Sequence, residues 1–157
     1  MSIRFVAFDS ELAKTLRNGG VDANGHKPER HIAPGGGMMP CRHCLTDIKA
    51  GEPYLILAHR PFPAPQPYAE QGPIFLHADN CPRHADSADV PSLFLEREAY
   101  LIRGYGAEDR IVYGTGKIVV PASLAQAARE AFDNPRVQYV HVRSASNNCY
   151  QCRIDRA

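Results

Sequence analysis

Two groups of potential metal-binding side chains place the strongest constraint on how this chain folds. Cys41 and Cys44 are separated by two residues in the segment CRHCLTDIKAGE, which covers residues 41–52. The segment FLHADNCPRH, at residues 75–84, adds three more candidates: His77, Cys81 and His84. Thiolate and imidazole are donors that zinc prefers, and zinc imposes no geometry of its own. If both segments bind one ion, the chain between them must return to the first turn, as it does in a hairpin.

The number of cysteines and the N-terminal sequence favour metal binding over disulfide bonds. The chain has five cysteines, an odd number that argues against a disulfide framework. The N-terminal segment MSIRFVAFDSELAK is too acidic, and its apolar stretch too short, for a secretory signal. No apolar run approaches the roughly 18 residues that a membrane-spanning helix needs. We therefore expect a cytoplasmic protein, in which thiols stay reduced and paired cysteines bind metal or carry out redox chemistry.

Length and composition predict one domain over residues 1–157. The sequence is 44% hydrophobic and 22% charged, which is ordinary for a soluble globular protein. A chain of this length can bury a core without help from metal or disulfides. Its formal charge of +1 provides no net attraction to nucleic acid or to an acidic membrane surface. We expect a protein or a small molecule as the partner rather than nucleic acid.

The hydrophobic pattern predicts an α+β fold, with a mostly antiparallel sheet and two short helices. Strands are expected at 3–8, 53–60, 73–77, 98–105, 110–114, 117–120, 137–144 and 149–155. Helices are expected over 10–16, with Ser10 as the cap, and over 124–132, opened by a capping box at Ser123 and Gln126. The stretch 20–40 shows no periodicity and is expected to be a loop.

The candidate metal site lies within residues 40–85, which we expect to form a zinc-binding subregion. Cys41 and Cys44 would supply one pair of ligands from a tight turn. The second pair would come from a strand end and the start of a following helix, with either His77 or His84 joining Cys81. Four protein ligands leave no open position for water or substrate, so the ion would be structural.

Three other roles for these cysteines remain open. The four residues of the site could each have a separate local role, since free cysteine is among the most buried residue types. Cys41 and Cys44 could be a redox pair, although such pairs prefer the start of a helix and 45–51 is too short for one. An all-cysteine site with Cys149 and Cys152 is opposed by geometry, because residues three apart in a strand point to opposite faces.

The order of motifs in this segment resembles a treble-clef zinc finger of the LIM or poly(ADP-ribose) polymerase type. In those families a C-x-x-C turn is followed by Ile or Val, a Gly-Glu-like turn, two strands, an aromatic-x-His motif and a last Cys. The matching residues here are Cys41, Cys44, Ile48, Gly51, Glu52, Phe75, His77 and Cys81. Three residues separate the last two, where those families usually have two. The resemblance implies a metal and leaves the function open.

A second resemblance extends over most of the chain. The segments PCRHCL, RPFPAPQPYAEQGPIFLHADNC, IVYGTG and YVHVRSASNNCYQCRIDR are similar to those of a bacterial family catalogued as a domain of unknown function, number 1203. This resemblance implies no activity.

The candidates for an enzyme site lie near the C-terminus. A cysteine nucleophile needs a nearby base, and His141 would approach Cys149 across the expected terminal hairpin, with Arg143 beside it. The register of that hairpin is not fixed by the sequence, so a histidine of the sheet and a solvated arginine are the competing interpretation.

We therefore predict a zinc-stabilised binding module with an unknown partner. The alternative is a small thiol-dependent enzyme that uses Cys149 with His141. A nucleic-acid-binding finger is a weaker alternative, supported only by the treble-clef resemblance.

Overall fold

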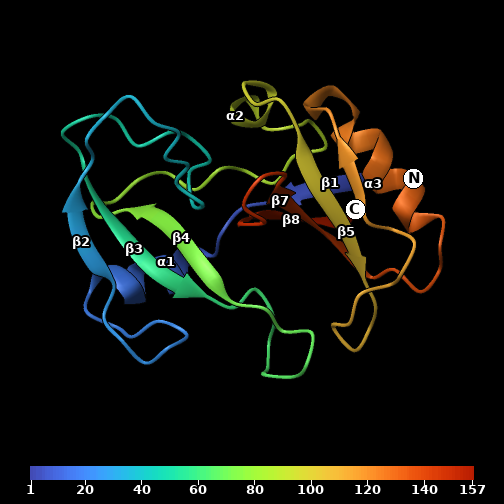
Figure 1. Cartoon of the computed structure of the whole chain (residues 1–157), viewed down its shortest axis with the longest axis horizontal. Coiled ribbons are helices and arrows are strands. Elements are labelled where there is room, and N and C mark those ends of the chain that lie inside the picture. Colours follow the sequence, from blue (N-terminus) through green and yellow to red (C-terminus); the bar gives the residue numbers. More distant parts are fainter. The chain divides into compact units, whose positions relative to one another are not determined.

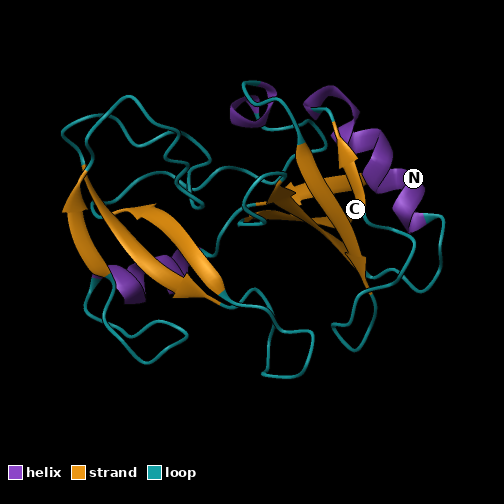
Figure 2. Ribbon diagram, in the orientation of Figure 1, coloured by secondary structure: helices purple, strands orange, loops and turns teal.

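A computed structural model describes all residues from Met1 to Ala157, and its chain divides into two compact units (Figure 1). Unit 1 comprises Met1–Val6, Ala64–Ala69 and Ala85–Ala157. Unit 2 comprises Ala7–Pro63 and Glu70–His84. Each unit has its own antiparallel sheet, which confirms the α+β fold class with the strands divided between two sheets (Figure 2). That the units make up a single domain stays a prediction.

The sheet of unit 1 has five antiparallel strands in the order β1-β8-β7-β5-β6. Their bounds are β1 Ile3–Val6, β5 Tyr100–Tyr105, β6 Lys117–Val119, β7 Tyr139–Ser144 and β8 Tyr150–Arg156. The first and last strands of the chain pair directly, with Ile3 opposite Arg156 and Phe5 opposite Ile154. The expected terminal hairpin is confirmed by the pairing of β7 with β8.

Helix α3 (Leu124–Phe132) packs against strand β5 and supplies much of the core of unit 1. Its buried residues recur with the spacing of one helical face: they are Leu124, Ala127, Ala128, Ala131 and Phe132. The 3-10 turn Pro121–Ser123 precedes it, and Ser123 makes no side-chain cap, so the expected capping box is wrong. A further short helix, α2 (Ser92–Leu95), was not expected; it buries Leu93 and Phe94.

Unit 2 contains a three-stranded sheet in the order β2-β3-β4 and one helix. The bounds are α1 Ser10–Arg17, β2 Glu29–Ile32, β3 Pro53–His59 and β4 Gly72–His77. The pairing of β3 with β4 confirms the expected hairpin. A common hydrophobic core joins this sheet to the helix; it includes Ala13, Leu16, Cys41, Cys44, Leu55, Leu57, Ile74 and Leu76.

Three local expectations are corrected by the structure. Strand β2 lies within the stretch 20–40 that was expected to be a loop; all four of its residues are exposed, so no hydrophobic alternation marks it. The cap of α1 is Asp9 rather than Ser10, since the Asp9 carboxylate accepts a hydrogen bond from the amide of Leu12 at 2.8 Å. Residues 110–114 form only an isolated bridge, between Ile111 and Tyr105.

None of the helices has the length and apolar character required to cross a membrane.

Candidate metal centre

The turn that contains Cys41 and Cys44 is held by backbone hydrogen bonds. The amide of Cys41 donates to the carbonyl of Thr46 at 2.9 Å, and the amide of Leu45 donates to the carbonyl of Cys41 at 2.9 Å. Leu45 has a φ of 51°, a left-handed conformation that is uncommon for this residue type. The turn is therefore a fixed structure that directs both sulfur atoms to one side.

The β3–β4 hairpin returns the chain to this turn. His77 is the last residue of β4, where it lies opposite Tyr54 in the register. Cys41 forms a parallel bridge with Phe75, and the amide of Arg42 donates to the carbonyl of Phe75 at 3.1 Å. Backbone pairing alone thus places the turn beside the end of β4, as the hairpin interpretation requires.

Cys81 lies in an irregular segment after β4. No helix begins there, contrary to expectation; the next helix along the chain is α2.

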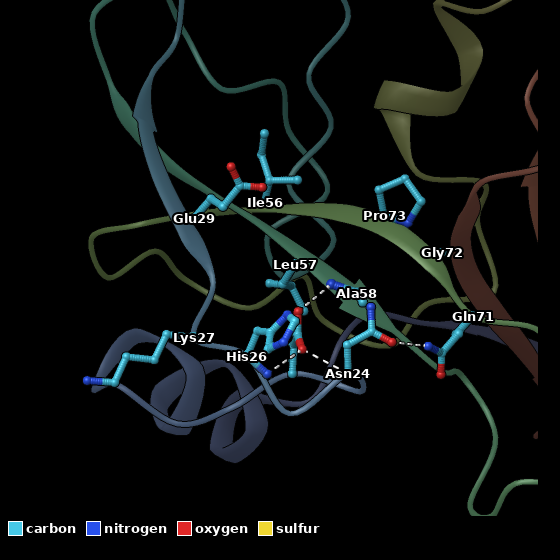
Figure 3. Close-up of a pocket in the computed structure, with 11 residues that line it drawn as sticks. Asn24, His26, Lys27, Glu29, Ile56, Leu57, Ala58, Gln71, Gly72 and Pro73 are labelled. Atoms are coloured by element: carbon cyan, nitrogen blue, oxygen red, sulfur yellow. Dashed lines mark hydrogen bonds between the residues drawn. The ribbon is translucent and has the colours of Figure 1, made fainter.

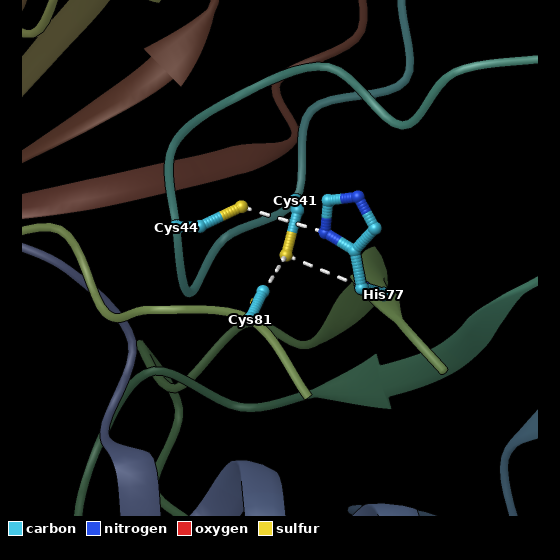
Figure 4. Close-up of side chains that lie close together, drawn as sticks. All are labelled: Cys41, Cys44, His77 and Cys81. Atoms are coloured by element: carbon cyan, nitrogen blue, oxygen red, sulfur yellow. Dashed lines mark hydrogen bonds between the residues drawn. The ribbon is translucent and has the colours of Figure 1, made fainter. Parts of the chain in front are cut away.

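Four donor atoms converge between the turn and the hairpin (Figure 4). The group consists of Cys41, Cys44, His77 and Cys81, whose ligand atoms all lie within 4.8 Å of one another. The two sulfur atoms of Cys41 and Cys81 are 3.9 Å apart, and the Cys44 sulfur is 3.4 Å from Nδ1 of His77. These four side chains could hold a metal ion.

The spacing of these atoms can be compared with that of a tetrahedral zinc site. With Zn–S bonds of about 2.3 Å and Zn–N bonds of about 2.0–2.1 Å, two sulfurs lie about 3.8 Å apart and a sulfur and a nitrogen about 3.6 Å apart. The observed separations of 3.9 Å and 3.4 Å are close to these values. These two separations therefore fit a tetrahedral ion, and the remaining donor separations are all within 4.8 Å.

A carboxylate fixes the orientation of the His77 ring. Nε2 of His77 lies 3.2 Å from Oε2 of Glu52, and the amide of Lys49 donates to that same oxygen at 2.7 Å. The pKa of Glu52 is lowered, chiefly by the hydrogen bond from Lys49 and further by His77. A carboxylate that accepts the Nε2 proton leaves the lone pair on Nδ1, which is the atom that faces the cluster.

Hydrogen-bond donors also surround the sulfur of Cys81. Nη2 of Arg17 donates to it at 3.1 Å, and Nδ1 of His43 lies 3.1 Å from it. The other ring nitrogen of His43 is 2.9 Å from the hydroxyl of Ser10. Such donors stabilise negative charge on a thiolate, which is the form that binds metal.

The thiols of Cys41 and Cys81 oppose each other's ionisation. The pKa of Cys41 lies far below its usual range, because the thiols of Cys44 and then Cys81 donate hydrogen bonds to its thiolate. The pKa of Cys81 is raised by its hydrogen bonds to Cys41 and Cys44, since a second thiolate beside them would be repelled. A bound cation would remove this repulsion, so the chemistry of the donor set also fits a metal.

The cluster is buried on one side and borders a hollow on the other. Cys41 and Cys44 belong to the hydrophobic core of unit 2, whereas His77 and Cys81 are half-buried. The hollow has a volume of about 450 Å³ and is lined by three of the four donors, together with polar and charged residues that include Lys49, Asp79, Asn80 and Arg83.

His84 also lines this hollow, but it is not one of the four converging donors. Its amide donates to the carbonyl of His43 at 2.9 Å, and its buried Nδ1 atom has no hydrogen-bond partner.

The comparison with known families gives one result. A family model described as "Protein of unknown function (DUF1203)" matches residues 38–156, which is most of the chain. The chain belongs to this family. The matched region begins just before Cys41 and contains all four donors of the cluster. No curated protein and no solved structure matches the chain.

The other candidate residues lie in unit 1. His141 is almost completely buried, and its ring packs against Tyr105, Tyr139 and Tyr150 at centroid distances of 4.6, 5.2 and 4.9 Å. In the register of the terminal hairpin, the residue opposite His141 is Arg153.

Arg143 is also buried rather than solvated, contrary to the competing interpretation; its Nη2 lies 3.4 Å from Nδ1 of His141. Cys149 is half-buried in the turn before β8, with its sulfur 3.8 Å from the carbonyl oxygen of Asn147. Cys152 is fully buried opposite Val142, and burial raises the pKa of its thiol. The group of side chains that could hold a metal ion does not include Cys149 or Cys152.

A second hollow of unit 2, of about 540 Å³, lies beside strands β2, β3 and β4 (Figure 3). The Asp22 carboxylate in its wall accepts hydrogen bonds from the amides of Asn24, His26 and Ala58. The side-chain amide of Gln71 donates a hydrogen bond to the side-chain oxygen of Asn24. The carboxylate of Asp22 thus holds the loop before β2 against β3, and we assign Asp22 a structural role.

Sequence reasoning identified the four donors but missed the residues that support them. Arg17 and His43 contact Cys81, and Glu52 contacts His77. Only Glu52 carried a signal, because it closes the Gly-Glu turn of the resembled motif. Arg17 reaches the cluster from the last turn of α1. In the sequence it is only a basic residue near the end of a helix, so nothing there indicates a contact with Cys81.

Proposed function

We propose that this chain is a zinc-stabilised binding module. A zinc ion bound by Cys41, Cys44, His77 and Cys81 would organise residues 40–85. The observation that carries the proposal is the convergence of four donor atoms within 4.8 Å of one another. Three thiolates and one imidazole are a common ligand set for structural zinc, and four protein ligands leave no position for a substrate.

The same segment is a candidate for a variant of the treble clef. The turn at Cys41 and the following β3–β4 hairpin support this assignment. The irregular segment that carries Cys81 would replace the expected helix start.

The hollow beside the ion is the proposed place for a partner. Its walls combine acidic and basic side chains, and the formal charge of the chain is only +1. These features favour a protein or small molecule over nucleic acid, whose binding depends on a basic surface. The proposed setting is the cytoplasm of a bacterium, where the thiols of the site stay reduced.

Elemental analysis tests the proposal directly. Protein purified without added zinc should contain about one equivalent of zinc per chain, the content of a single four-ligand site. A Cys44→Ser variant should contain much less, and a Cys149→Ser variant, altered outside the cluster, should match the natural chain. Natural protein that neither contains zinc nor takes it up from solution would overturn the proposal.

A further inference from the structure

Cys81 differs from the other three donors in how it is held. Cys41 and Cys44 lie in a hydrogen-bonded turn within the core, and His77 ends a strand. Cys81 belongs to an irregular segment, is half-buried and lines the 450 Å³ hollow beside the cluster. It is therefore the sulfur donor most open to a small molecule in solution.

The surroundings of Cys81 suit a reactive sulfur. Zinc would keep it as a thiolate, which is the nucleophilic form of cysteine. The guanidinium of Arg17, at 3.1 Å, can stabilise negative charge on an oxygen that becomes attached to this sulfur. The sulfur of Cys41 lies 3.9 Å away, close enough to react in a second step.

We propose that Cys81 is a site of oxidation by hydroperoxides, and that it then forms a disulfide with Cys41 and releases the metal ion. This inference rests on the proposed zinc site. Cys44 also lies beside Cys81, but it is the less suitable partner because its sulfur makes further contacts with Thr46 and His77 at 3.1 and 3.4 Å.

The reaction has two steps. The Cys81 thiolate attacks an oxygen of the hydroperoxide, an S–O bond forms and the O–O bond breaks, and the leaving alkoxide or hydroxide takes a proton from water. The Cys41 thiolate then attacks the sulfur of the sulfenic acid, so that an S–S bond forms and the S–O bond breaks. The hydroxide that leaves is protonated to water. Two thiolates have lost two electrons, and one hydroperoxide has gained them.

The disulfide would remove two of the four ligands of the ion. A disulfide requires an S–S distance of about 2.05 Å, so the two sulfurs must approach each other from their present 3.9 Å. The irregular segment of Cys81 can supply this movement more readily than the fixed turn of Cys41. Cys44 and His77 alone make a weak site, and the ion is lost. The hollow loses part of its wall in the same event.

The test uses the zinc-loaded full chain and hydrogen peroxide. Released zinc is measured with a chromogenic chelator, thiols are counted, and peptides are mapped by mass spectrometry. The expected result is one zinc released and two thiols lost for each peroxide consumed, with a Cys41–Cys81 cross-link that dithiothreitol reverses.

Two variants sharpen the result. Cys81→His keeps a zinc donor but removes the oxidisable sulfur, so its zinc should stay bound under peroxide. Cys149→Ser removes a thiol outside the cluster and should behave as the natural chain does. If Cys81→His does not bind zinc, the peptide map of the natural chain decides.

Some results would overturn this inference alone. They are zinc retained at peroxide levels that oxidise Cys149, a cross-link between Cys41 and Cys44, or Cys81 recovered as sulfinic acid without a cross-link. A natural chain that binds no zinc would overturn the proposed function instead.

Discussion

Nε2 of His77 lies 3.2 Å from the carboxylate of Glu52, on the side of the ring away from the cysteine cluster. The carboxylate is itself held by the amide of Lys49. This arrangement fixes both the ring orientation and the nitrogen that carries the proton. Nδ1 of His77 is thus oriented for an ion before any ion binds. Glu52 can be substituted without changing any of the four donor residues.

We expect Glu52→Ala to weaken zinc binding by roughly 10–100-fold, the usual effect of removing a partner of a metal-binding histidine. The four donors stay in place, so the loss should appear as lower affinity in a competition titration with a chelator. Glu29→Ala removes another exposed glutamate of unit 2, one that is outside the cluster and pairs with His31. This control should bind zinc as tightly as the natural chain, and equal affinities for both variants would contradict the role of Glu52.

Chelation should loosen part of the protein rather than unfold all of it. Structural zinc contributes about 10–16 kcal/mol in zinc-finger peptides. Unit 1 has its own sheet, so we expect it to stay folded without this energy. After chelation we expect faster amide exchange in strands β3 and β4 and in the adjoining residues 61–63 and 70–71 of unit 2, while most of the far-UV circular dichroism signal remains. Complete loss of that signal would show that the ion supports the whole chain.

Asp22 should stabilise unit 2 at neutral pH. Burial alone would raise the pKa of its carboxyl, but the amides of Ala58, His26 and Asn24 donate to it and lower the pKa overall. We expect Asp22→Ala to reduce the free energy of unfolding by about 1–2 kcal/mol at pH 7, the usual cost of losing a carboxylate that accepts hydrogen bonds from backbone amides.

The pH dependence of this effect has a definite sign. A lowered pKa means that the contribution is fully present above the pKa of the unfolded chain and is lost as the pH falls through the folded value. Urea unfolding at several pH values should therefore show the difference between Asp22→Ala and the natural chain shrinking below about pH 4. A difference that stays constant down to pH 2 would contradict this assignment.

Thiol labelling separates the binding module from a thiol-dependent enzyme. Cys149 is half-buried, whereas Cys152 is fully buried and burial raises the pKa of its thiol. For the binding module we expect Cys149 to react with iodoacetamide at the rate of a simple thiol, and Cys152 to react only after unfolding. A Cys149 rate far above that of glutathione, lost in His141→Ala, would support the enzyme that the sequence also suggested.

The sequence indicated that Cys41, Cys44, His77 and Cys81 lie close together, because the signals for this convergence are local. Cys41 and Cys44 mark a tight turn by their spacing alone, and the short apolar runs on either side of the proline-rich 61–72 segment predict the hairpin that brings His77 back. Both signals can be read over a few residues.

Features that depend on distant partners were missed. Strand β2 has only exposed residues, so its existence depends on pairing with β3 and not on a hydrophobic pattern. Arg17 acts on the cluster only through the packing of α1, and the contact with Cys81 joins residues far apart in the sequence. The division of the strands between two sheets was likewise invisible, because sequence order does not state which strands pair.

Because β1 pairs with β8, the two units can complete their folding at different times during synthesis on the ribosome. All four donors of the cluster have been synthesised once Cys81 emerges, so the proposed ion could bind while residues 82–157 are still to be made. The five-stranded sheet cannot be completed until the end of synthesis, because β1 pairs with β8, the last strand to be made. A product truncated before β8 could therefore bind the proposed ion while its five-stranded sheet is incomplete. The unpaired β1 segment of such a product would be prone to aggregation.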